Sequence, residues 1–169
     1  MLKYMSLNTS FIGELQHEAA LTRKILERVP LDQKDWKPHE KSMTLGRLAT
    51  HIAETLHWIT VILGADEFDF AANPSPKRHV AADTAELLSI LDNNLENAIK
   101  ALSAATDEDF NKHWVIKRGE QVIMSSPKKV AVRGWGFSHQ FHHRGQLTVY
   151  LRLLDIPVPG MYGPSADER

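Results

Sequence analysis

The sequence predicts an all-α fold: a four-helix bundle with a long crossover between helices 2 and 3 and a small β-hairpin before helix 4. In four stretches, apolar residues recur at intervals of three and four, the spacing of the buried face of a helix. Strand-like alternation is confined to one short stretch. With 169 residues, the chain is long enough for one sizeable core and too short for two ordinary domains, so we treat residues 1–169 as a single domain.

Composition and charge exclude several classes of function. The chain has a net charge of −1 and a pI near 6.8, so it has no excess positive charge that would bind nucleic acid or an anionic membrane. Cysteine is absent, which excludes disulfides and thiolate metal sites, so any thiol in a reaction comes from outside the chain. The N-terminal residues lack the apolar core of a signal peptide, and no apolar run approaches the ~20 residues that span a bilayer. We therefore expect a cytoplasmic protein.

The first predicted helix runs from about Asn8 to Val29, because its apolar residues repeat by three and four. Polar residues 8–10 can cap its start, and Pro30 ends it. Residues 31–43, which are rich in charge, are predicted to form a loop. Trp36 is expected to anchor this loop to the edge of the core.

The second predicted helix follows Thr44 or Ser42, either of which can cap it, and ends at Gly64. Its inward face contains one histidine at a position where an apolar residue is expected. That face comprises Leu48, His51, Ile52, Thr55, Ile59 and Ile62. His57 lies about 120° from His51 around the helix and is interpreted as a surface or interface residue.

Residues 65–82 are predicted to form a linker without secondary structure. At ~3.3 Å per residue this segment reaches nearly 60 Å, so helices 2 and 3 can run parallel to each other. Asp83 and Glu86 form an Asp-type capping box at the start of the third helix. The apolar face of that helix comprises Leu87, Leu91, Leu95, Ala98 and Leu102.

A small hairpin is predicted over residues 113–124, where two β-prone runs flank the turn residues 118–120. Basic side chains surround this hairpin. They are Lys112, Lys117, Arg118, Lys128, Lys129 and Arg133. We interpret them as a solvated edge, and a patch for an anionic partner is the alternative.

The fourth predicted helix begins at Pro127, which suits the first turn of a helix. Gly134, Gly136 and Gly145 each cost ~1 kcal/mol relative to alanine inside a helix, which suggests a close helix approach or a bend. Residues 156–169 contain three prolines and cannot be helical. Their apolar side chains suggest that this tail packs back on the helices.

Three histidines mark the predicted functional site. His139 and His143 are four apart and project from one face of the fourth helix, with ~5–6 Å between their Cβ atoms. We expect this face to point into the core and to continue through Gln146, Tyr150, Leu153 and Leu154. His51, on the inward face of the second helix, can complete the site. His142, three residues after His139, is an alternative ligand.

Three imidazoles from two helices can hold a divalent metal and leave a coordination position open. The pKa of water bound at such a position can fall from 15.7 to about 7, and a thiol bound there can lose its proton. Imidazole suits several metals, zinc, nickel, iron and copper among them. Gln146 and Glu54 are spaced to accept the second N–H of a ligating histidine, and Tyr150 could orient a water molecule.

Two segments resemble the DinB family, the DinB/YfiT-like metalloenzymes. They are WKPHEKSMTLGRLATHIAETLHW, residues 36–58, and HQFHHRGQLTVYLRLLDIPVPGMYGPSADE, residues 139–168. The resemblance implies a four-helix bundle with a long crossover and a homodimer. It also implies a divalent metal, which could be zinc, nickel, iron or manganese, on His51, His139 and His143.

The resemblance also bears on the reaction. Relatives in the wider superfamily include transferases and isomerases that use low-molecular-weight thiols such as bacillithiol, mycothiol or glutathione, and some members are induced by DNA damage. It implies a small-molecule substrate. The net charge of −1, rather than the resemblance, leads us to expect no nucleic-acid or membrane partner. The sequence contains no GxSxG, HExxH, GxGxxG or P-loop motif, which leaves the histidines as the candidate site.

Three hypotheses follow for the function. The first is a metal-dependent enzyme, a thiol transferase or a hydrolase, that activates a low-molecular-weight thiol or water against a small electrophilic substrate. The second is a non-catalytic metal-binding protein of the stress response. The third is a dimeric helical interaction module, in which the histidines are ordinary core or interface residues.

Overall fold

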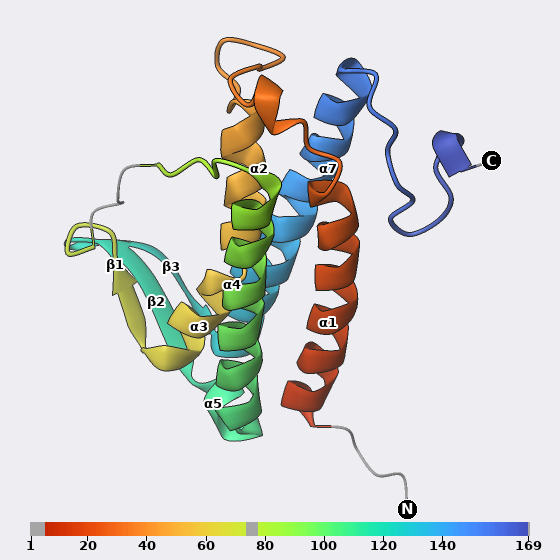
Figure 1. Ribbon diagram of the computed structural model, residues 1–169. Coiled ribbons are helices and arrows are strands. Elements are labelled where there is room, and N and C mark those ends of the chain that lie inside the picture. The colour runs from red at the N-terminus through yellow and green to blue at the C-terminus, as the bar shows by residue number, and fades with distance from the viewer. Residues whose placement is uncertain (1–5, 74–77, 169) are drawn as a thin grey trace, which may run out of the picture.

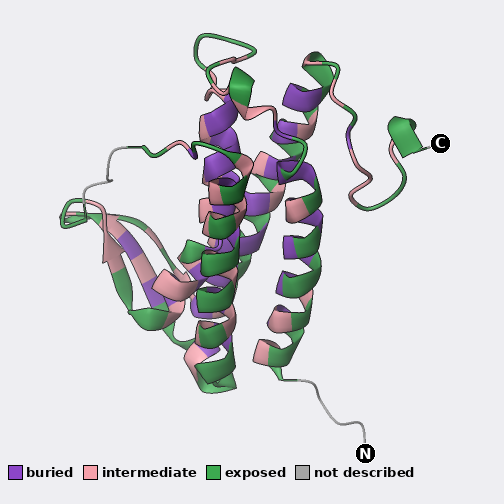
Figure 2. Ribbon diagram, in the orientation of Figure 1, coloured by how far each residue is buried: buried purple, intermediate pink, exposed green. Residues whose placement is uncertain are grey.

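The structure, a computed structural model, describes residues 6–73 and 78–168. It is mostly helical, with a small three-stranded sheet at one side (Figure 1). The long helices α1 (Leu7–Leu26), α2 (Leu45–Glu54), α4 (Thr84–Ala104) and α7 (His139–Leu153) lie side by side, and α4 packs on both α1 and α2. The buried residues of these helices line the sides that face one another (Figure 2). Over the described ranges, no helix has the length and apolar character needed to cross a membrane.

The loop after α1 is anchored as predicted. It contains one short 3₁₀ turn, Leu31–Gln33. The ring of Trp36 meets that of Tyr150 edge-on, with 5.6 Å between centroids. The backbone carbonyl of Trp36 accepts a hydrogen bond from the N–H of Leu45. Thr44, rather than Ser42, caps α2 by accepting a hydrogen bond from the N–H of Arg47. The loop is therefore fixed against both α2 and α7.

The second predicted helix is in fact two helices, α2 and α3 (His57–Gly64). At the break, the Thr55 hydroxyl donates to the carbonyl of Ile52 at 2.7 Å, and the Thr55 N–H bonds to the same carbonyl. Threonine hydroxyls compete in this way with the helical ladder, and a tighter turn replaces it here. The apolar face nevertheless continues through the break, because Ile59 is fully buried.

The predicted linker contains a strand, β1 (Glu67–Asp69), which corrects the expectation of an unstructured segment. It pairs in parallel with β2 (His113–Arg118), and β3 (Gln121–Pro127) pairs antiparallel on the other side. The hairpin prediction is confirmed, and Gly119 provides the left-handed residue of its turn at φ +57°. In Figure 1, α2 and α4 run in the same direction, which is the relative direction that the sequence allowed for these helices.

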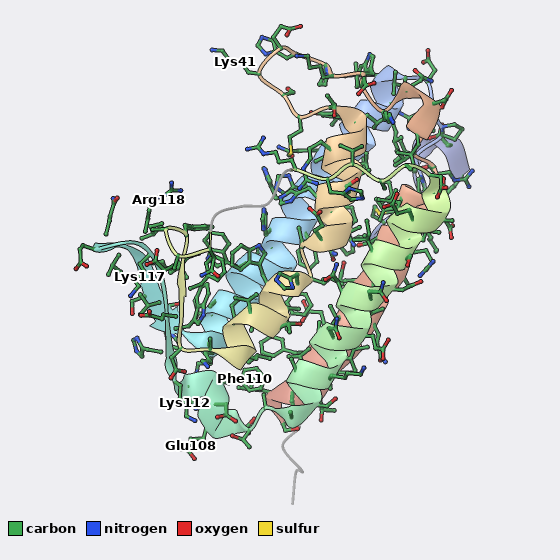
Figure 3. The ribbon with its side chains drawn as sticks, turned by 60° about the vertical axis from the view of Figure 1, so that its left-hand side comes forward. Lys41, Glu108, Phe110, Lys112, Lys117 and Arg118 are labelled. Carbon is green, nitrogen blue, oxygen red and sulfur yellow. The ribbon has the colours of Figure 1, made fainter. Side chains whose placement is uncertain are left out.

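The start of α4 is capped by Asp83, which accepts the N–H of Glu86 at 2.8 Å. The Glu86 carboxylate accepts the N–H of Ala82 instead of that of Asp83, so the cap is a variant of the predicted box. A further short helix, α5 (Asp107–Asn111), was not predicted. Its Phe110 is fully buried and points towards the helices (Figure 3).

The fourth predicted helix contains an irregular middle. Pro127 precedes α6 (Lys128–Ala131), a π-helical segment η2 (Val132–Ser138) follows, and α7 begins at His139. A Cβ at Gly136 would lie 2.7 Å from Cγ1 of Ile59, so this glycine permits the close approach of η2 to α3 that the sequence suggested. Gly134 and Gly145 have open space around them and have no such role.

The buried face of α7 differs from the predicted one. Gln146 is exposed and Leu153 is 57% exposed, whereas Gln140 and Arg144 are buried. The prediction failed because polar residues were not counted as core, yet Arg144 is paired with Glu18 inside the protein. His139 and His143 consequently lie half-buried at the margin of the core.

Most of the basic residues around the hairpin form ion pairs with described residues, but Lys128 is buried, so the prediction of a solvated edge does not hold for every one of them. Lys117 and Arg118 lie at the outer end of the hairpin (Figure 3). Lys117 pairs with Glu67, and Lys112 with Asp109, each at 2.8 Å. Arg118 lies over the ring of Phe70.

Candidate metal centre

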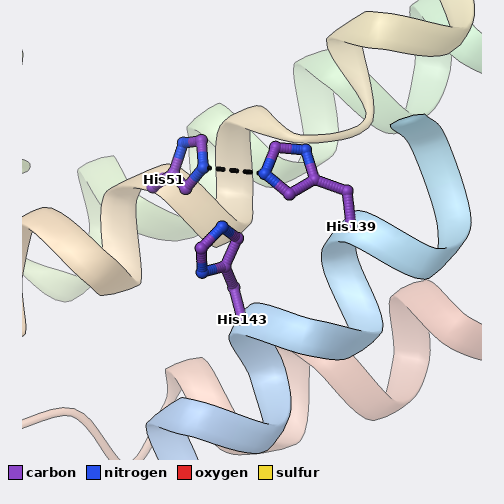
Figure 4. A group of neighbouring side chains, drawn as sticks. All are labelled: His51, His139 and His143. Carbon is purple, nitrogen blue, oxygen red and sulfur yellow. Dashed lines mark hydrogen bonds between the residues drawn. The ribbon is translucent and has the colours of Figure 1, made fainter. Parts of the chain in front are cut away.

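His51, His139 and His143 lie together (Figure 4). His51 comes from α2, and the other two lie one turn apart at the start of α7, directly after the π-helical segment. One ligand nitrogen from each ring lies within 4.8 Å of the others. Nε2 of His51 is 3.2 Å from Nε2 of His139. These are the three residues that the sequence predicted would converge.

The donor set fits a divalent metal. With Zn–N bonds of about 2.0–2.1 Å, two nitrogens of a tetrahedral site lie roughly 3.3–3.4 Å apart, close to the separation of His51 and His139. The group consists of three histidines alone among the residues that the structure describes. Because imidazole is neutral, a bound cation would keep its full charge, which favours strong acidification of a further ligand.

Burial prepares two of the histidines to bind a cation. It lowers the pKa of His139 to about 4, and the neighbouring His143 and His51 add to this effect. Burial also lowers the pKa of His143. Both rings are therefore neutral at pH 7, with a lone pair available to a metal.

The predicted partner of His143 is in place. Nδ1 of His143 lies 2.8 Å from Oε1 of Gln146, and since that oxygen only accepts, Nδ1 carries the proton. This leaves Nε2 of His143 free to bind a metal. His142 is exposed and lies outside the converging group, although its ring is near that of His143.

Around His51 the contacts differ from those predicted. Oε2 of Glu54 is 3.9 Å from Nδ1 of His51, too far for a hydrogen bond, and bonds to Arg47 at 2.6 Å. Arg47 itself reaches Nδ1 of His51 at 3.3 Å. Arg47 was not predicted as part of the site, although its position one turn before His51 could have indicated it. Burial alone would raise the pKa of Glu54, but contacts with His51 and Arg47 lower it overall.

Tyr150 is occupied elsewhere. Its hydroxyl donates to the carbonyl of Met43 at 3.1 Å, and its ring packs on Trp36. Its observed contacts thus join α7 to the loop before α2 and differ from the predicted role of orienting a water molecule.

Helices that bring three histidines together beside a small sheet define a helical protein with a candidate metal centre. The sequence profile of the DinB family matches residues 5–169, nearly the whole chain. The protein belongs to the DinB family.

Proteins of known sequence and structure agree with this assignment. The chain is 27% identical to the uncharacterized protein YrdA of Bacillus subtilis strain 168, over 94% of this chain and 89% of that protein. It is 24% identical to YjoA of the same organism, over 88% and 91%. The crystal structure of a DinB-like protein from Bacillus cereus ATCC 10987 superposes with a TM-score of 0.72 at 22% identity, covering 95% of this chain and 100% of that chain. The crystal structure of YjoA gives 0.70 at 17%, covering 92% and 99%. These structures show a shared fold.

Proposed function

We propose that the protein is a metal-dependent enzyme that activates a low-molecular-weight thiol or water for transfer to, or hydrolysis of, a small electrophilic substrate. His51, His139 and His143 would hold a divalent cation, with zinc or nickel expected first and iron or manganese as alternatives. The observation that carries this proposal is the convergence of three imidazole donors from two helices, with no carboxylate in the group. When bound, the cation would act as a Lewis acid that lowers the pKa of a ligated thiol or water.

The chain's own residues would keep this centre in place. Gln146 holds the ring of His143 so that Nε2 faces the other imidazoles. Trp135 packs edge-on against His139, with 6.1 Å between ring centroids. Arg47 and Glu54 place a compensated charge pair beside His51. The centre is therefore held on helices, which restrict its geometry more than loops would.

We also infer the finer architecture and the assembly. Taken as one member each, α1, α2–α3, α4 and α6–α7 would form the four-helix bundle of the family. A homodimer through the outer face of α7 is supported by Val149 and Leu153, which are 56% and 57% exposed. Sedimentation of the protein at micromolar concentration tests the dimer, and a monomer would contradict it.

The test of function begins with untagged protein purified without nickel resin. Elemental analysis is expected to give close to one divalent metal per chain, and His51→Ala is expected to lose it. A panel of thiols with chlorodinitrobenzene, and of activated esters with water, is then assayed with and without chelator. Turnover that requires both metal and His51 supports the proposal. Bound metal without turnover would favour a metal-binding stress protein, and absence of metal would favour an interaction module.

A further inference from the structure

A large pocket adjoins the metal centre at His51. It has a volume of ≈ 1040 Å³ and lies between the α2–α3 segment, β1 and α4. Ligand pockets of small molecules reach this size. His51 is the histidine of the centre that lines it, so the pocket lies beside the converging imidazoles.

One wall of the pocket is aromatic. Trp58, Phe68 and Phe70 line it, and all three are half-buried, so their rings are in part accessible from the pocket. The centroid distances are 5.2 Å for Trp58–Phe68, 5.2 Å for Phe68–Phe70 and 6.3 Å for Trp58–Phe70, and each pair meets edge-on. Three rings at steep mutual angles offer faces and edges to a flat ring system, the arrangements that aromatic pairs prefer.

The charges of the pocket favour an anion. Arg47 lines it but is compensated by Glu54 at 2.6 Å, and His79 pairs with Glu86 at 2.8 Å. Arg78 also lines the pocket, is exposed, and has no ion pair with a described residue. Arg78 is therefore the lining cation that no described carboxylate contacts, and it is the side chain that an anionic group can approach.

The aromatic wall is also continuous with the metal centre. Trp58 packs on Trp135 at 5.1 Å between centroids, and Trp135 lies against His139. A ligand that contacts both Trp58 and His51 would thus lie alongside the converging imidazoles.

We propose that this pocket binds a flat aromatic molecule that carries an anionic group, such as an aryl carboxylate. Its ring system contacts Trp58, Phe68 and Phe70, and its anionic group lies towards Arg78. Binding does not depend on a metal. The further step, that the substrate turned over is an electrophile that also carries an aryl carboxylate group, rests on the proposed function.

Calorimetric titration of untagged, chelator-treated protein tests the binding with three matched probes. They are 2-naphthoate, its neutral analogue 2-naphthalenemethanol, and its saturated analogue decahydro-2-naphthoate. We expect 2-naphthoate to bind about three- to tenfold more tightly than either analogue, as one surface charge pair and one set of aromatic contacts allow. Equal binding of the alcohol would overturn the anionic part, and equal binding of the saturated acid would overturn the aromatic part.

Variants locate the site. Phe68→Leu is expected to weaken naphthoate binding about three- to tenfold, and Phe70→Leu serves if the first variant melts early. Phe141→Leu, the same change at a half-buried position outside the pocket, is the control and should leave binding unchanged. Arg78→Gln should weaken binding about two- to fivefold, whereas Arg28→Gln on exposed surface should not. Equal effects of the test and control variants would overturn the inference.

The two proposals fail in different ways. If naphthoate binds to the metal-free protein but no turnover occurs in the presence of metal, the proposed enzymatic function is contradicted and the proposed ligand of the pocket is retained. If the protein turns over chlorodinitrobenzene but binds none of the three probes, the proposed enzymatic function is supported and the proposed ligand of the pocket is ruled out.

Discussion

At the scale of single residues, the protons on the histidines determine how the centre binds a cation. Arg47 can only donate, so Nδ1 of His51 accepts its hydrogen bond, and the proton of the neutral ring lies on Nε2, facing His139. Binding of a cation through Nε2 requires this proton to move to Nδ1. The nearest carboxylate acceptor for it there is Glu54, at 3.9 Å.

Glu54 would have to move closer to Nδ1 when a cation binds, and it would then accept this proton. Glu54→Ala is therefore expected to weaken metal binding, by about ten- to a hundredfold if this acceptor forms in the metal-bound protein. The change also leaves the positive charge of Arg47 uncompensated beside the cation. Zinc affinity is measured by competition with a chromogenic chelator. Glu27→Ala, at an exposed position at the end of α1 and outside the group of three histidines, is the control. Unchanged affinity in Glu54→Ala would exclude this role.

The lowered pKa of His139 predicts a pH dependence in the metal-free protein. Its folded-state pKa of about 4 lies below the ordinary 6.5, so the unfolded chain binds more protons between these values. The stability that the neutral ring provides is complete above pH 6.5 and is lost as the pH falls towards 4. Urea unfolding at pH 7 and pH 5 should show a smaller loss of stability for His139→Gln than for the original protein. His142→Gln, at an exposed position, should keep the original loss.

The three histidines were predictable because an i, i+4 pair and one histidine on an apolar face are both visible in the sequence. Arg47 and the buried partners of Arg144 were not. Their positions depend on contacts such as Arg144–Glu18, which joins residues far apart in the chain. A charged residue gives no sign in the sequence that its partner will allow its burial.

At the scale of elements, the long regular helices were predictable, and their interruptions were not. α1 and α4 follow the expected apolar repeats closely. The break at Thr55 involves a side-chain hydrogen bond. The π-helical segment packs closely against Ile59, and β1 pairs with β2. Periodicity within a window of the sequence does not contain this information.

Gly136→Ala tests whether the close approach of η2 to α3 positions His139. The new methyl group would lie 2.7 Å from Ile59, so η2 must shift, at a cost of about 1–3 kcal/mol of stability. The start of α7 should shift with it, and zinc affinity should fall. Gly134→Ala, in the same segment but with open space around it, should leave both quantities unchanged or slightly raised. Equal effects of the two variants in urea unfolding and zinc titration would contradict the packing argument.

The ion pair Arg144–Glu18 fastens α7 to α1. Their side chains are 2% and 7% exposed, and Arg144 also bonds to the hydroxyls of Thr22 and Tyr162. Glu18→Ala leaves a buried guanidinium uncompensated and should cost about 3–5 kcal/mol in urea unfolding. Glu14 lies on α1, as Glu18 does, and forms a more exposed ion pair with Arg133 of η2. Glu14→Ala removes this pair and should cost about 1 kcal/mol or less. Similar losses of stability for both variants would show that the buried ion pair contributes no more to stability than the exposed one.

At the scale of the whole molecule, the centre joins two parts of the chain that are distant in sequence. His51 lies in the first half of the chain, and the HxxxH pair near its end. A cation held by all three can bind only when α2 and α7 are packed together, so binding favours the folded state. The core, in contrast, is formed by apolar residues from every long helix and includes none of the three histidines, so we expect it to form without a metal.

Metal removal should therefore lower the melting temperature without unfolding the protein at 25 °C. With free zinc at a hundred times its dissociation constant, the folded state gains about 2.7 kcal/mol, which corresponds to roughly 5–10 °C for a chain of this length. Calorimetric melting with zinc and with EDTA measures the difference, and His51→Ala should melt at the same temperature under both conditions. If EDTA unfolds the protein at 25 °C, the centre is a structural requirement of the fold. If the original protein melts identically in both conditions, the three imidazoles do not act together on one cation.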